Sequence, residues 1–344
     1  MRRISMKAAV WHGGQDIRIE DMPRPEIENN EVLVRVKSAG ICGSELHAYE
    51  GISARRKPPL IMGHEFSGEI TEVGRDIRYL VEGDKVAVDP VIRCGTCEQC
   101  LRGRGNICRN LTLIGLHTRG AFAEYVAVPA ANCHKLPDNV AFEEGSMGEP
   151  VSVAVHAVNR TPIKLGDTVA VVGAGVIGLT VLQAAKLAGA AKVFVTDILD
   201  YRLDLARSLG ADLTVNTQVE DPVDRIMGET EGLGVDVVLE AVGLEVTVRQ
   251  AMRMATTGGK LTIIGNLARM MELDVQDAVL RELEIKGSYC YAPTDFRRAI
   301  NLISDRKIDV KSLITNVLPL FEAKRGFELL YKKTDKVLKV LLKP

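Results

Sequence analysis

The sequence lacks a strong charge of either sign and any internal repeat. Its 44 basic and 45 acidic residues give a net charge of −1, so composition offers no electrostatic argument for binding nucleic acid or an anionic membrane surface. The amino-terminal run MRRISMKAAVW has arginines but no apolar core, unlike a signal peptide. We therefore expect a cytoplasmic protein with no nucleic-acid or membrane partner, and a length of 344 residues suits two domains.

Long charge-free stretches offer no clear membrane segment either. The stretch from Thr168 to Ala185 has eighteen residues without a charge, which by length alone suits a transmembrane helix. Three glycines interrupt it, and Lys186 follows directly. A buried parallel strand, a glycine turn and a helix explain the same stretch better.

The hydrophobic pattern of the sequence changes near residue 150. Before it, short valine-rich runs such as EVLVRVKSAG and DKVAVDP indicate an irregular β domain. Beyond it, strand-like runs such as DTVAVVG and AKVFVTD alternate with helix-like runs such as VIGLTVLQAAKLAG. The alternation predicts an α/β fold with a doubly wound parallel sheet and helices on both faces.

Four cysteines lie within fifteen residues, at Cys94, Cys97, Cys100 and Cys108. Four thiolates this close can surround one tetrahedral zinc ion at about 2.3 Å per Zn–S bond. The polar, basic and glycine-rich residues around them would make a poor core, and disulfides would require an oxidising compartment. We therefore predict a structural zinc site here, and core roles for the remaining thiols of Cys133 and Cys290.

A glycine-rich motif, G-x-G-x-x-G, follows the strand-like run TVAVV and opens a helix-like run. Gly173 allows a tight turn, Gly175 lets a pyrophosphate approach the backbone, and Gly178 lets helix and strand pack closely. Asp197 ends the next strand, where a carboxylate accepts hydrogen bonds from the adenosine ribose and repels a 2′-phosphate, so NAD is favoured over NADP. Arg202, five residues on, leaves NADP open, because an arginine here can serve a 2′-phosphate.

Further motifs carry a resemblance to a known family. CGSELH begins at Cys42, GHEFSGEITEVGRDI spans Gly63 to Ile77, and GEP ends at Pro150. With the cysteine cluster and the glycine motif, in this order, they make the sequence similar to the zinc-containing medium-chain alcohol and polyol dehydrogenases over nearly its whole length.

The resemblance implies a division into two domains. Residues 1–150, completed by 291–344, would form a GroES-like catalytic domain that binds zinc, and residues 151–290 a Rossmann domain that binds NAD. The family's cofactor site would add residues around the glycine motif: Val176, Ile177, Val242 and Gly265.

The resemblance also implies a second, catalytic zinc ion. Cys42, His64 and Glu149 match the family's ligand positions, and this set leaves a fourth place for water or a substrate oxygen. Glu149 followed by Pro150 is typical of sorbitol-type polyol dehydrogenases, where alcohol dehydrogenases proper have a cysteine. Glu65, beside His64, is a second candidate carboxylate, because in the family it either binds the zinc or lies just behind it.

A proton relay completes the implied chemistry. Zinc acts as a Lewis acid on the bound hydroxyl. In the family, the hydroxyl at the position of Ser44 takes the alcohol's proton and passes it through the nicotinamide ribose to a histidine, which His47 matches. The alternatives are a helix-capping hydroxyl for Ser44 and a surface histidine for His47.

The expected activity is hydride transfer from a secondary alcohol, such as a polyol, sugar alcohol or vicinal diol, to NAD. L-threonine 3-dehydrogenase is the rival, because KPPLIMGHE looks similar to that branch, which also has Glu-Pro at the third ligand. A zinc- and NAD-binding relative without turnover is a third possibility, which the intact ligand set argues against.

The substrate itself is not named by the sequence. Candidate specificity residues are Tyr49, Tyr291 and the segment from Gly51 to Arg56. Cys290 stands where the sorbitol branch usually has an arginine, which counts against sorbitol.

The resemblance finally implies a homotetramer. In the family the sheet extends across subunits near the segment from Gly259 to Gly265 and the following run LARMMELDVQ. We therefore expect Met270 and Met271 to be interface residues.

Overall fold

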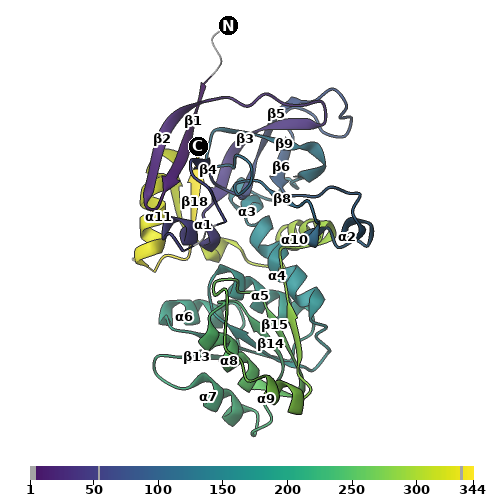
Figure 1. Cartoon of the computed structure of the whole chain (residues 1–344), viewed down its shortest axis with the longest axis vertical. Helices are drawn as coiled ribbons and strands as arrows, with labels where there is room; N and C mark the ends of the chain where they lie inside the picture. The colour runs from purple at the N-terminus through teal and green to yellow at the C-terminus, as the bar shows by residue number, and fades with distance from the viewer. Residues whose placement is uncertain (1–4, 53–54, 334–335) are drawn as a thin grey trace. The chain divides into compact units, whose positions relative to one another are not determined.

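The computed structural model of the chain describes residues 5–52, 55–333 and 336–344 (Figure 1). Residues 1–4, at the start of the predicted catalytic domain, and Ser53 and Ala54, in the predicted specificity segment, lie outside the described residues. The chain divides into two compact units. The first comprises Met1–Glu149, Ala292–Asp305 and Val310–Pro344, and the second comprises Pro150–Tyr291 and Arg306–Asp309.

The first unit is built mainly from antiparallel strands, and its main sheet has the order β10-β6-β5-β3-β18-β17, with β9 paired to β3. Two smaller sheets have the orders β2-β1-β4 and β7-β8. The strands of this unit are β1 (Ser5–Gly13), β2 (Asp16–Pro23), β3 (Glu31–Gly40), β4 (Leu60–Ile61), β5 (Glu65–Val73), β6 (Lys85–Val88), β7 (Val91–Ile92), β8 (Thr112–Leu113), β9 (Tyr125–Pro129), β10 (Cys133–Lys135), β17 (Ile314–Pro319) and β18 (Lys339–Lys343).

Short helices join and cover these strands. The α-helices are α1 (Gly43–Tyr49), α2 (Glu98–Leu101), α3 (Phe142–Ser146), α10 (Pro293–Ser304) and α11 (Ala323–Lys332), with 3₁₀ turns η1 (Gly105–Ile107), η2 (Ala130–Asn132), η3 (Lys311–Leu313) and η4 (Leu320–Glu322). Helix α4 (Gly148–Arg160) contains the boundary between the units.

The core of the first unit follows from alternation along its central strand. In β3, Val32, Val34 and Val36 occupy every second position and are at most 2% exposed. Alternate residues of a strand lie on one face, so these valines form one apolar surface. They pack in one core cluster with Phe66 and Ile70 of the neighbouring β5.

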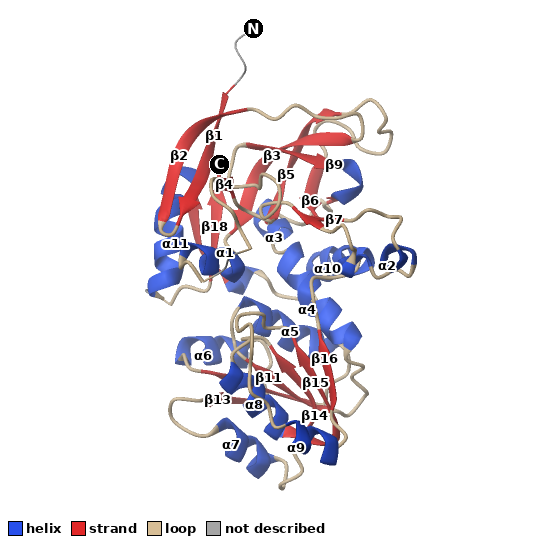
Figure 2. Cartoon of the chain, in the orientation of Figure 1, coloured by secondary structure: helices blue, strands red, loops and turns tan. Residues whose placement is uncertain are grey.

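The second unit contains a six-stranded parallel sheet with the order β13-β12-β11-β14-β15-β16 (Figure 2). Its strands are β11 (Thr168–Val172), β12 (Lys192–Asp197), β13 (Leu213–Asn216), β14 (Val235–Glu240), β15 (Ala255–Ile263) and β16 (Glu284–Gly287). Its remaining helices are α5 (Val176–Leu187), α6 (Asp200–Ser208), α7 (Pro222–Glu229), α8 (Glu245–Met254) and α9 (Val275–Leu280).

The strand order of this sheet reverses direction at β11. The chain moves outward from β11 to β13 and then returns to add β14, β15 and β16 on the other side. Because parallel crossovers are right-handed, α5 and α6 belong to one face and α8 to the opposite face. The predicted α/β fold with a doubly wound parallel sheet is confirmed, and the stretch Thr168 to Ala185 is the buried strand β11 followed by the glycine turn and α5.

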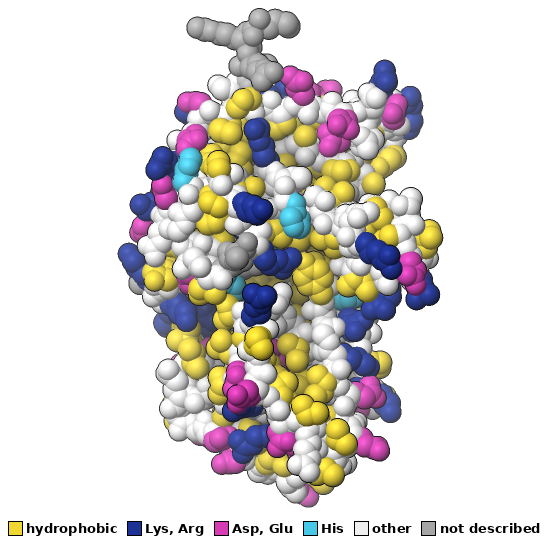
Figure 3. All heavy atoms as spheres, viewed as in Figure 1, with side chains coloured by type: hydrophobic (Ala, Val, Ile, Leu, Met, Phe, Trp, Pro, Cys, Tyr) yellow, Lys and Arg dark blue, Asp and Glu magenta, His cyan; other side chains and the backbone are white. Residues whose placement is uncertain are grey.

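Two surface properties accompany this fold. None of the helices in the described part of the chain combines the length and apolar character needed to cross a bilayer. On the face shown in Figure 3, Lys and Arg side chains are interspersed with Asp and Glu side chains, in keeping with the net charge of −1.

The carboxyl-terminal strand joins the main sheet beside the amino-terminal strands. In β18, Leu341 pairs with Gly40 of β3, and Gly40 in turn pairs with Glu65 at the start of β5. This register places Lys339 against Glu65, and the two side chains, each 2% exposed, form an ion pair. Lys339 Nζ also donates to the carbonyl of Ile41 at 3.1 Å.

Gly40 is the residue that leaves room for this ion pair. A Cβ atom at this position would lie 2.3 Å from Glu65 Oε2 and 3.0 Å from Lys339 Cε. Any larger residue would therefore displace the buried carboxylate or the lysine stem. The pair thus depends on three segments that are far apart in the sequence.

We predict that Lys339→Met destabilises the fold by about 3–5 kcal/mol, because Glu65 is left as a buried charge without its partner. Urea unfolding followed by circular dichroism measures the loss. The double variant Glu65→Gln/Lys339→Met should recover most of it, since replacing both partners of a buried pair is often nearly neutral.

Lys343→Met in the same strand is the control. Lys343 pairs with Glu143, and its side chain is 48% exposed, so its loss should cost about 0–1 kcal/mol. Equal effects of Lys339→Met and Lys343→Met would contradict a stabilising role for the buried pair.

Candidate active site

Cys42, His64 and Glu65 meet where α1 and β5 begin. Their candidate ligand atoms, one from each side chain, all lie within 4.8 Å of one another. Cys42 is the N-cap residue of α1, in extended conformation, and His64 directly precedes β5. The structure thus brings one thiol, one imidazole and one carboxyl group together from two motifs that are more than twenty residues apart.

Glu45 orients two members of this group. It is 0% exposed, and its Oε2 accepts a hydrogen bond from the backbone N–H of Cys42 at 3.0 Å. Its Oε1 accepts from the N–H of Gly63 at 2.8 Å and lies 2.8 Å from His64 Nδ1. With Nδ1 engaged, Nε2 is the nitrogen of His64 that remains for a ligand, as in metal sites where a carboxylate fixes the imidazole.

The role of Glu45 was not predicted from the sequence. Its signal was present in CGSELH, because Glu45 is the third residue of α1, where a carboxylate reaches back to the N-cap. The capping interaction and the orientation of His64 use different oxygens of one carboxylate.

Glu149, the other predicted carboxylate ligand, is 9% exposed in the first turn of α4 and is not among the three groups within 4.8 Å. Burial raises the pKa of Glu149 to about 8; the positive charge of His64 opposes this rise, and the negative charge of Glu65 adds to it. Glu149 therefore lies close enough to feel both residues. Unlike Glu65, it forms no ion pair with Lys339 among the described residues.

The electrostatics of this cluster favour a bound cation. Burial alone would lower the pKa of His64, but the carboxylate of Glu45 and the thiol of Cys42 raise it well above its usual value. In the same way, Glu65 and Cys42 outweigh burial and raise the pKa of Lys339. A site with this much negative charge suits a divalent metal ion, and thiolate, imidazole and carboxylate are the donors that zinc accepts.

The predicted relay residues lie on α1. Ser44, exposed at the start of the helix, donates from Oγ to Cys42 Sγ over 3.5 Å, so its hydroxyl lies beside the Cys42–His64–Glu65 group. His47 is three residues further on and shares that side of the helix. Burial lowers the pKa of His47; Glu50 opposes this effect and Arg56 reinforces it.

The structure buries both tyrosines that were predicted as specificity residues. Tyr49 is 1% exposed and packs against Phe327 with ring centroids 5.2 Å apart, so it belongs to the core of the first unit rather than to a pocket wall. Tyr291 is likewise 0% exposed. Arg56, which ends the predicted specificity segment from Gly51 to Arg56, donates from Nη2 to the Ser44 hydroxyl at 3.2 Å.

The four clustered cysteines form a second group with the geometry of a zinc site. Sulfur–sulfur separations are 3.4 Å for Cys94 and Cys108, 3.5 Å for Cys97 and Cys100, 3.8 Å for Cys97 and Cys108, and 4.0 Å for Cys94 and Cys100. A tetrahedron with Zn–S bonds of about 2.3 Å has edges of about 3.8 Å. All four thiols are free of disulfides, and their spacing fits one zinc ion.

Backbone N–H groups favour the thiolate form of one cysteine of this cluster. Hydrogen bonds from Thr96 and Cys97 lower the pKa of Cys94 to about 6. Burial and neighbouring thiols instead raise the pKa of Cys100 to about 12. Four thiolates cannot share this space without a cation, and a zinc ion would remove that penalty.

The glycine motif adopts the strand–turn–helix geometry of a phosphate-binding loop. Gly173 has φ +97° directly after β11, and Gly175 is the N-cap of α5, so Val176 and Ile177 form the first turn of the helix. A Cβ at Gly178 would lie 1.7 Å from the carbonyl oxygen of Gly173, so only glycine fits there. The helix N-terminus is therefore open to an anion.

Val242 and Gly265 converge on the same loop. A Cβ at Gly173 would lie 2.5 Å from Val242 Cγ2, and one at Gly265 would lie 2.0 Å from the nitrogen of Gly243. Glu240, a buried residue that the sequence analysis did not single out, fixes this arrangement. Its Oε1 accepts from the N–H groups of Val242 at 2.9 Å and Gly243 at 2.8 Å.

Asp197 links the end of β12 to the glycine motif. Its Oδ2 accepts from the N–H of Ala174 at 2.7 Å, and its Oδ1 accepts from the N–H of Ile198 at 2.8 Å. Arg202 Nη1 lies 3.9 Å from Asp197 Oδ2. The two residues that argue for different cofactors are therefore neighbours, and the aspartate is the more buried, with 8% of its side chain exposed against 21%.

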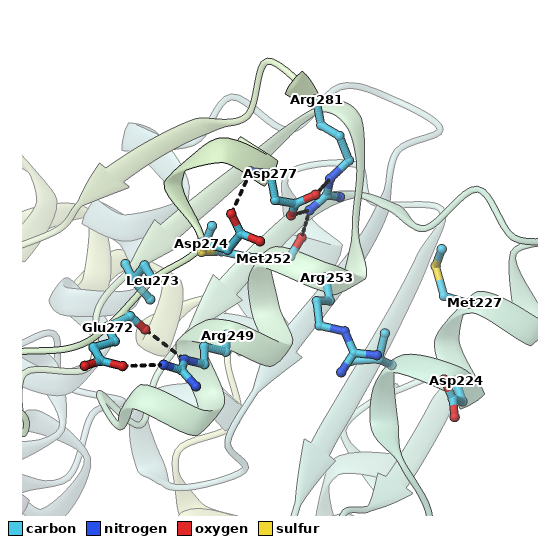
Figure 4. Close-up of a pocket in the computed structure, with 11 residues that line it drawn as sticks. Asp224, Met227, Arg249, Met252, Arg253, Glu272, Leu273, Asp274, Asp277 and Arg281 are labelled. Carbon is cyan, nitrogen blue, oxygen red and sulfur yellow. Dashed lines mark hydrogen bonds and ion pairs between the residues drawn. The ribbon is translucent and has the colours of Figure 1, made fainter. Parts of the chain in front are cut away.

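A separate cavity of about 850 Å³ lies in the second unit between α7, α8 and the segment that includes α9 (Figure 4). Arg249 donates to the carbonyl of Glu272 at 2.8 Å, and Arg281 pairs with Asp277. Most charges around this cavity are thus paired within the fold. None of the residues predicted for catalysis, metal or cofactor lines it.

Two family models match the chain. The alcohol dehydrogenase GroES-like domain matches residues 28–138, and the zinc-binding dehydrogenase model matches residues 176–305. The first match contains the cysteine cluster and the Cys42–His64–Glu65 group, whereas Glu149 and Lys339 lie outside it. The second match begins at Val176, the first residue of α5.

Characterised relatives match over nearly the whole chain. L-threonine 3-dehydrogenase of Bacillus licheniformis is 37% identical, covering 95% of this chain and 96% of the relative. Sorbitol dehydrogenase of Bacillus subtilis is 35% identical, covering 99% and 98%. The crystal structure of a zinc-binding dehydrogenase from Sinorhizobium meliloti 1021 bound to NADP has 36% identity and a TM-score of 0.93, covering 99% and 100%. The chain therefore belongs to the zinc-containing medium-chain alcohol and polyol dehydrogenases, a family of oxidoreductases that act on small alcohols.

Proposed function

We propose that this protein is a zinc-dependent dehydrogenase that transfers a hydride from a secondary alcohol, such as a polyol, sugar alcohol or vicinal diol, to NAD. The observation that carries the proposal is the meeting of Cys42, His64 and Glu65 within 4.8 Å, with Ser44 Oγ 3.5 Å from the cysteine sulfur. When bound, zinc supplies Lewis-acid polarisation of the alcohol oxygen and the nicotinamide accepts the hydride.

Cys42, His64 and Glu149 are the proposed ligands of the catalytic zinc. Glu65 is nearer to Cys42 and His64, but its charge is already neutralised by Lys339. Glu149 has no such partner among the described residues, and its pKa of about 8 shows how much burial disfavours its ionised form. A divalent cation would reverse that effect. In this arrangement Glu65 stays with Lys339 while Glu149 binds the metal.

Ser44 and His47 are proposed to carry the proton. The Ser44 hydroxyl lies beside the ligand group, where it can accept the proton of a bound alcohol. The lowered pKa of His47 keeps its imidazole neutral near pH 7, so it can receive a proton near the end of the relay.

The second unit is proposed to bind NAD through the glycine loop. The open N-terminus of α5 would take the pyrophosphate, and Val176, Ile177, Val242 and Gly265 would line the cofactor site. Asp197 favours NAD because a carboxylate repels a 2′-phosphate. The NADP-bound relative makes Arg202 the residue on which the alternative rests.

Residues Cys94 to Cys108 are proposed to hold a structural zinc ion. The cluster lies in a loop with short helical turns, α2 and η1, neither of which buries an apolar side chain. Such a loop gains its order from the metal.

L-threonine 3-dehydrogenase remains the second candidate function, because a relative of that name matches at 37% identity. The sorbitol dehydrogenase relative, at 35%, supports the polyol reading equally. A panel of polyols, sugar phosphates, diols and L-threonine, followed by NADH absorbance, decides between them. No turnover with any of these alcohols would favour a binding relative without activity.

We also propose a homotetramer. Strand β16 ends the six-stranded sheet, and Ile285 within it is 39% exposed. In the preceding segment Met270, Val279 and Leu280 are 86%, 69% and 74% exposed. An open strand edge beside exposed apolar side chains suits a contact between copies. Met271, also predicted at the interface, instead packs partly buried against the core of the second unit.

We predict that the protein purified without chelator carries about two zinc ions per chain, one for each ligand group. Glu149→Ala should retain only the structural ion and a cooperative unfolding transition, because one of three protein ligands of the catalytic ion is lost. Cys94→Ser should lose the other. Plasma emission spectroscopy measures both, together with dehydrogenase activity.

Glu143→Ala, which changes a partly exposed carboxylate in α3, is the control and should keep both ions. Two zinc ions and full activity in Glu149→Ala would assign the ligand to Glu65 instead. A wild-type value near one that Cys94→Ser leaves unchanged would exclude the structural site.

We predict that NAD⁺ supports turnover with kcat/KM at least about tenfold above NADP⁺, because Asp197 disfavours the 2′-phosphate. Asp197→Ala should erode that preference. Steady-state kinetics with both cofactors measures it. Equal wild-type efficiencies, with Arg202→Ala selectively impairing NADP⁺, would show that the arginine decides.

We predict a tetramer in sedimentation velocity at micromolar concentration. Leu280→Glu should dissociate it, because the charge would be buried against another copy. Leu165→Glu, at a position in the second unit that is 93% exposed, should leave the assembly intact. A fully active wild-type monomer would end this proposal.

A further inference from the structure

Arg56 holds a buried positive charge beside the proposed active site. It lies between α1 and β4 and is 7% exposed. Its Nη1 donates to the carbonyl of Ser44 at 2.7 Å, its Nη2 to Ser44 Oγ at 3.2 Å, and its Nε more weakly to the carbonyl of Gly115 at 3.4 Å. All three acceptors are uncharged oxygens.

No carboxylate among the described residues pairs with this guanidinium. Glu45 is the acid whose pKa the charge of Arg56 helps to lower, but its oxygens are occupied by Cys42, Gly63 and His64. Arg93, whose side chain is 12% exposed, shows the usual arrangement, because it pairs with Asp89 at 2.6 Å. An arginine cannot shed its proton, so burying one without a counter-ion carries a large cost in free energy.

The charge of Arg56 acts on its surroundings. The pKa of His47 and that of His117 are both lowered, by burial first, and in each case the guanidinium contributes. Glu50 acts on His47 in the opposite sense, but it forms no ion pair with Arg56 among the described residues.

Two donors of the guanidinium remain for a ligand. It has five N–H groups, and the three hydrogen bonds above leave one on each terminal nitrogen. Guanidinium N–H groups are strong donors to the oxygens of a carboxylate or phosphate. Through Ser44 Oγ, they lie one hydroxyl group away from Cys42 Sγ.

We propose that Arg56 is a specificity-determining residue that binds an oxyanion, a carboxylate or a phosphate, carried by the secondary-alcohol substrate. This inference rests on the proposed function for the position of the reacting hydroxyl. It makes the preferred substrate a hydroxy acid or a phosphorylated sugar alcohol rather than a neutral polyol. The anion would supply the counter-charge that the fold does not provide.

Two matched pairs of alcohols test the proposal: 3-hydroxybutyrate against 2,3-butanediol, and sorbitol 6-phosphate against sorbitol. For the wild type we expect kcat/KM for one anionic member to exceed that for its neutral partner by about tenfold or more, as suits a charge-assisted hydrogen bond. The pair that shows this preference identifies carboxylate or phosphate. Arg56→Met should reduce the ratio to about one, and Arg56→Lys should keep part of it.

Lys57→Met is the matched control, because it removes the positive charge of an exposed side chain one residue later in the chain and should leave the ratio unchanged. Using the ratio of paired substrates cancels any general effect of Arg56→Met on Ser44. A wild-type preference for the neutral members, or the same ratio in Arg56→Met as in the wild type, would overturn the assignment. So would an effect of Arg56→Met confined to the KM of the cofactor, which would place the guanidinium at the dinucleotide instead.

Titration calorimetry of the zinc-loaded protein with the same four compounds, without cofactor, separates this proposal from the function itself. Binding of an anionic member that Arg56→Met abolishes and Lys57→Met preserves supports the assignment even if no alcohol is oxidised, in which case only the proposed function fails. Oxidation of the alcohols without charge preference and without such binding rejects Arg56 alone. Absence of both turnover and Arg56-dependent binding rejects the two together.

Discussion

The buried ion pair between Glu65 and Lys339 is the interaction on which the first unit depends. It exists because β18 pairs with β3, and β3 with β5, at a glycine that leaves space for both side chains. The pair ties the last strand of the chain to the segment that carries His64. A buried charge without its partner is strongly destabilising, so the region proposed to bind the metal and the carboxyl-terminal strand are energetically coupled.

Around that pair, the structure separates two kinds of charge. Cys42, Glu45 and Glu65 gather about His64, and Glu45 and Cys42 raise its pKa, an arrangement that suits a divalent cation. Beyond Ser44, the guanidinium of Arg56 has only neutral acceptors. A substrate that offers a hydroxyl to the first region and an oxyanion to the second would complement both. Specificity in this protein is thus proposed to arise from charge placement more than from pocket shape.

In the second unit the organising constraint is close backbone approach. Gly173, Gly178 and Gly265 each lie where a Cβ would collide with the chain. Two buried or nearly buried carboxylates hold the surrounding loops by accepting backbone N–H groups: Asp197 from Ala174, and Glu240 from Val242. Hydrogen bonds within the unit therefore hold the loops that would bind a dinucleotide.

Local patterns were sufficient for much of this protein. The alternation of strand-like and helix-like runs determined the doubly wound sheet, because parallel strands joined by helices admit few other packings. The spacing of Cys94 to Cys108 predicted the cysteine cluster, and the folded loop places its sulfurs 3.4 to 4.0 Å apart. The resemblance to the dehydrogenase family followed from motifs in order, and the comparisons confirm it.

The side-chain contacts that only the tertiary structure decided are those between distant segments of the chain. In the sequence, Lys339 is a single charge in an apolar run. Only the sheet register shows that it pairs with Glu65. In the sequence, Glu45 is a residue of a helix and Glu240 is the end of a strand. The structure shows that Glu45 contacts His64 and that Glu240 accepts from the N–H of Val242. Tyr49, which the sequence suggested for a pocket, packs on Phe327 from the carboxyl-terminal helix α11. Sequence periodicity reports which face of an element is buried, but not which distant side chain meets it there, because that choice is made by strand register and packing.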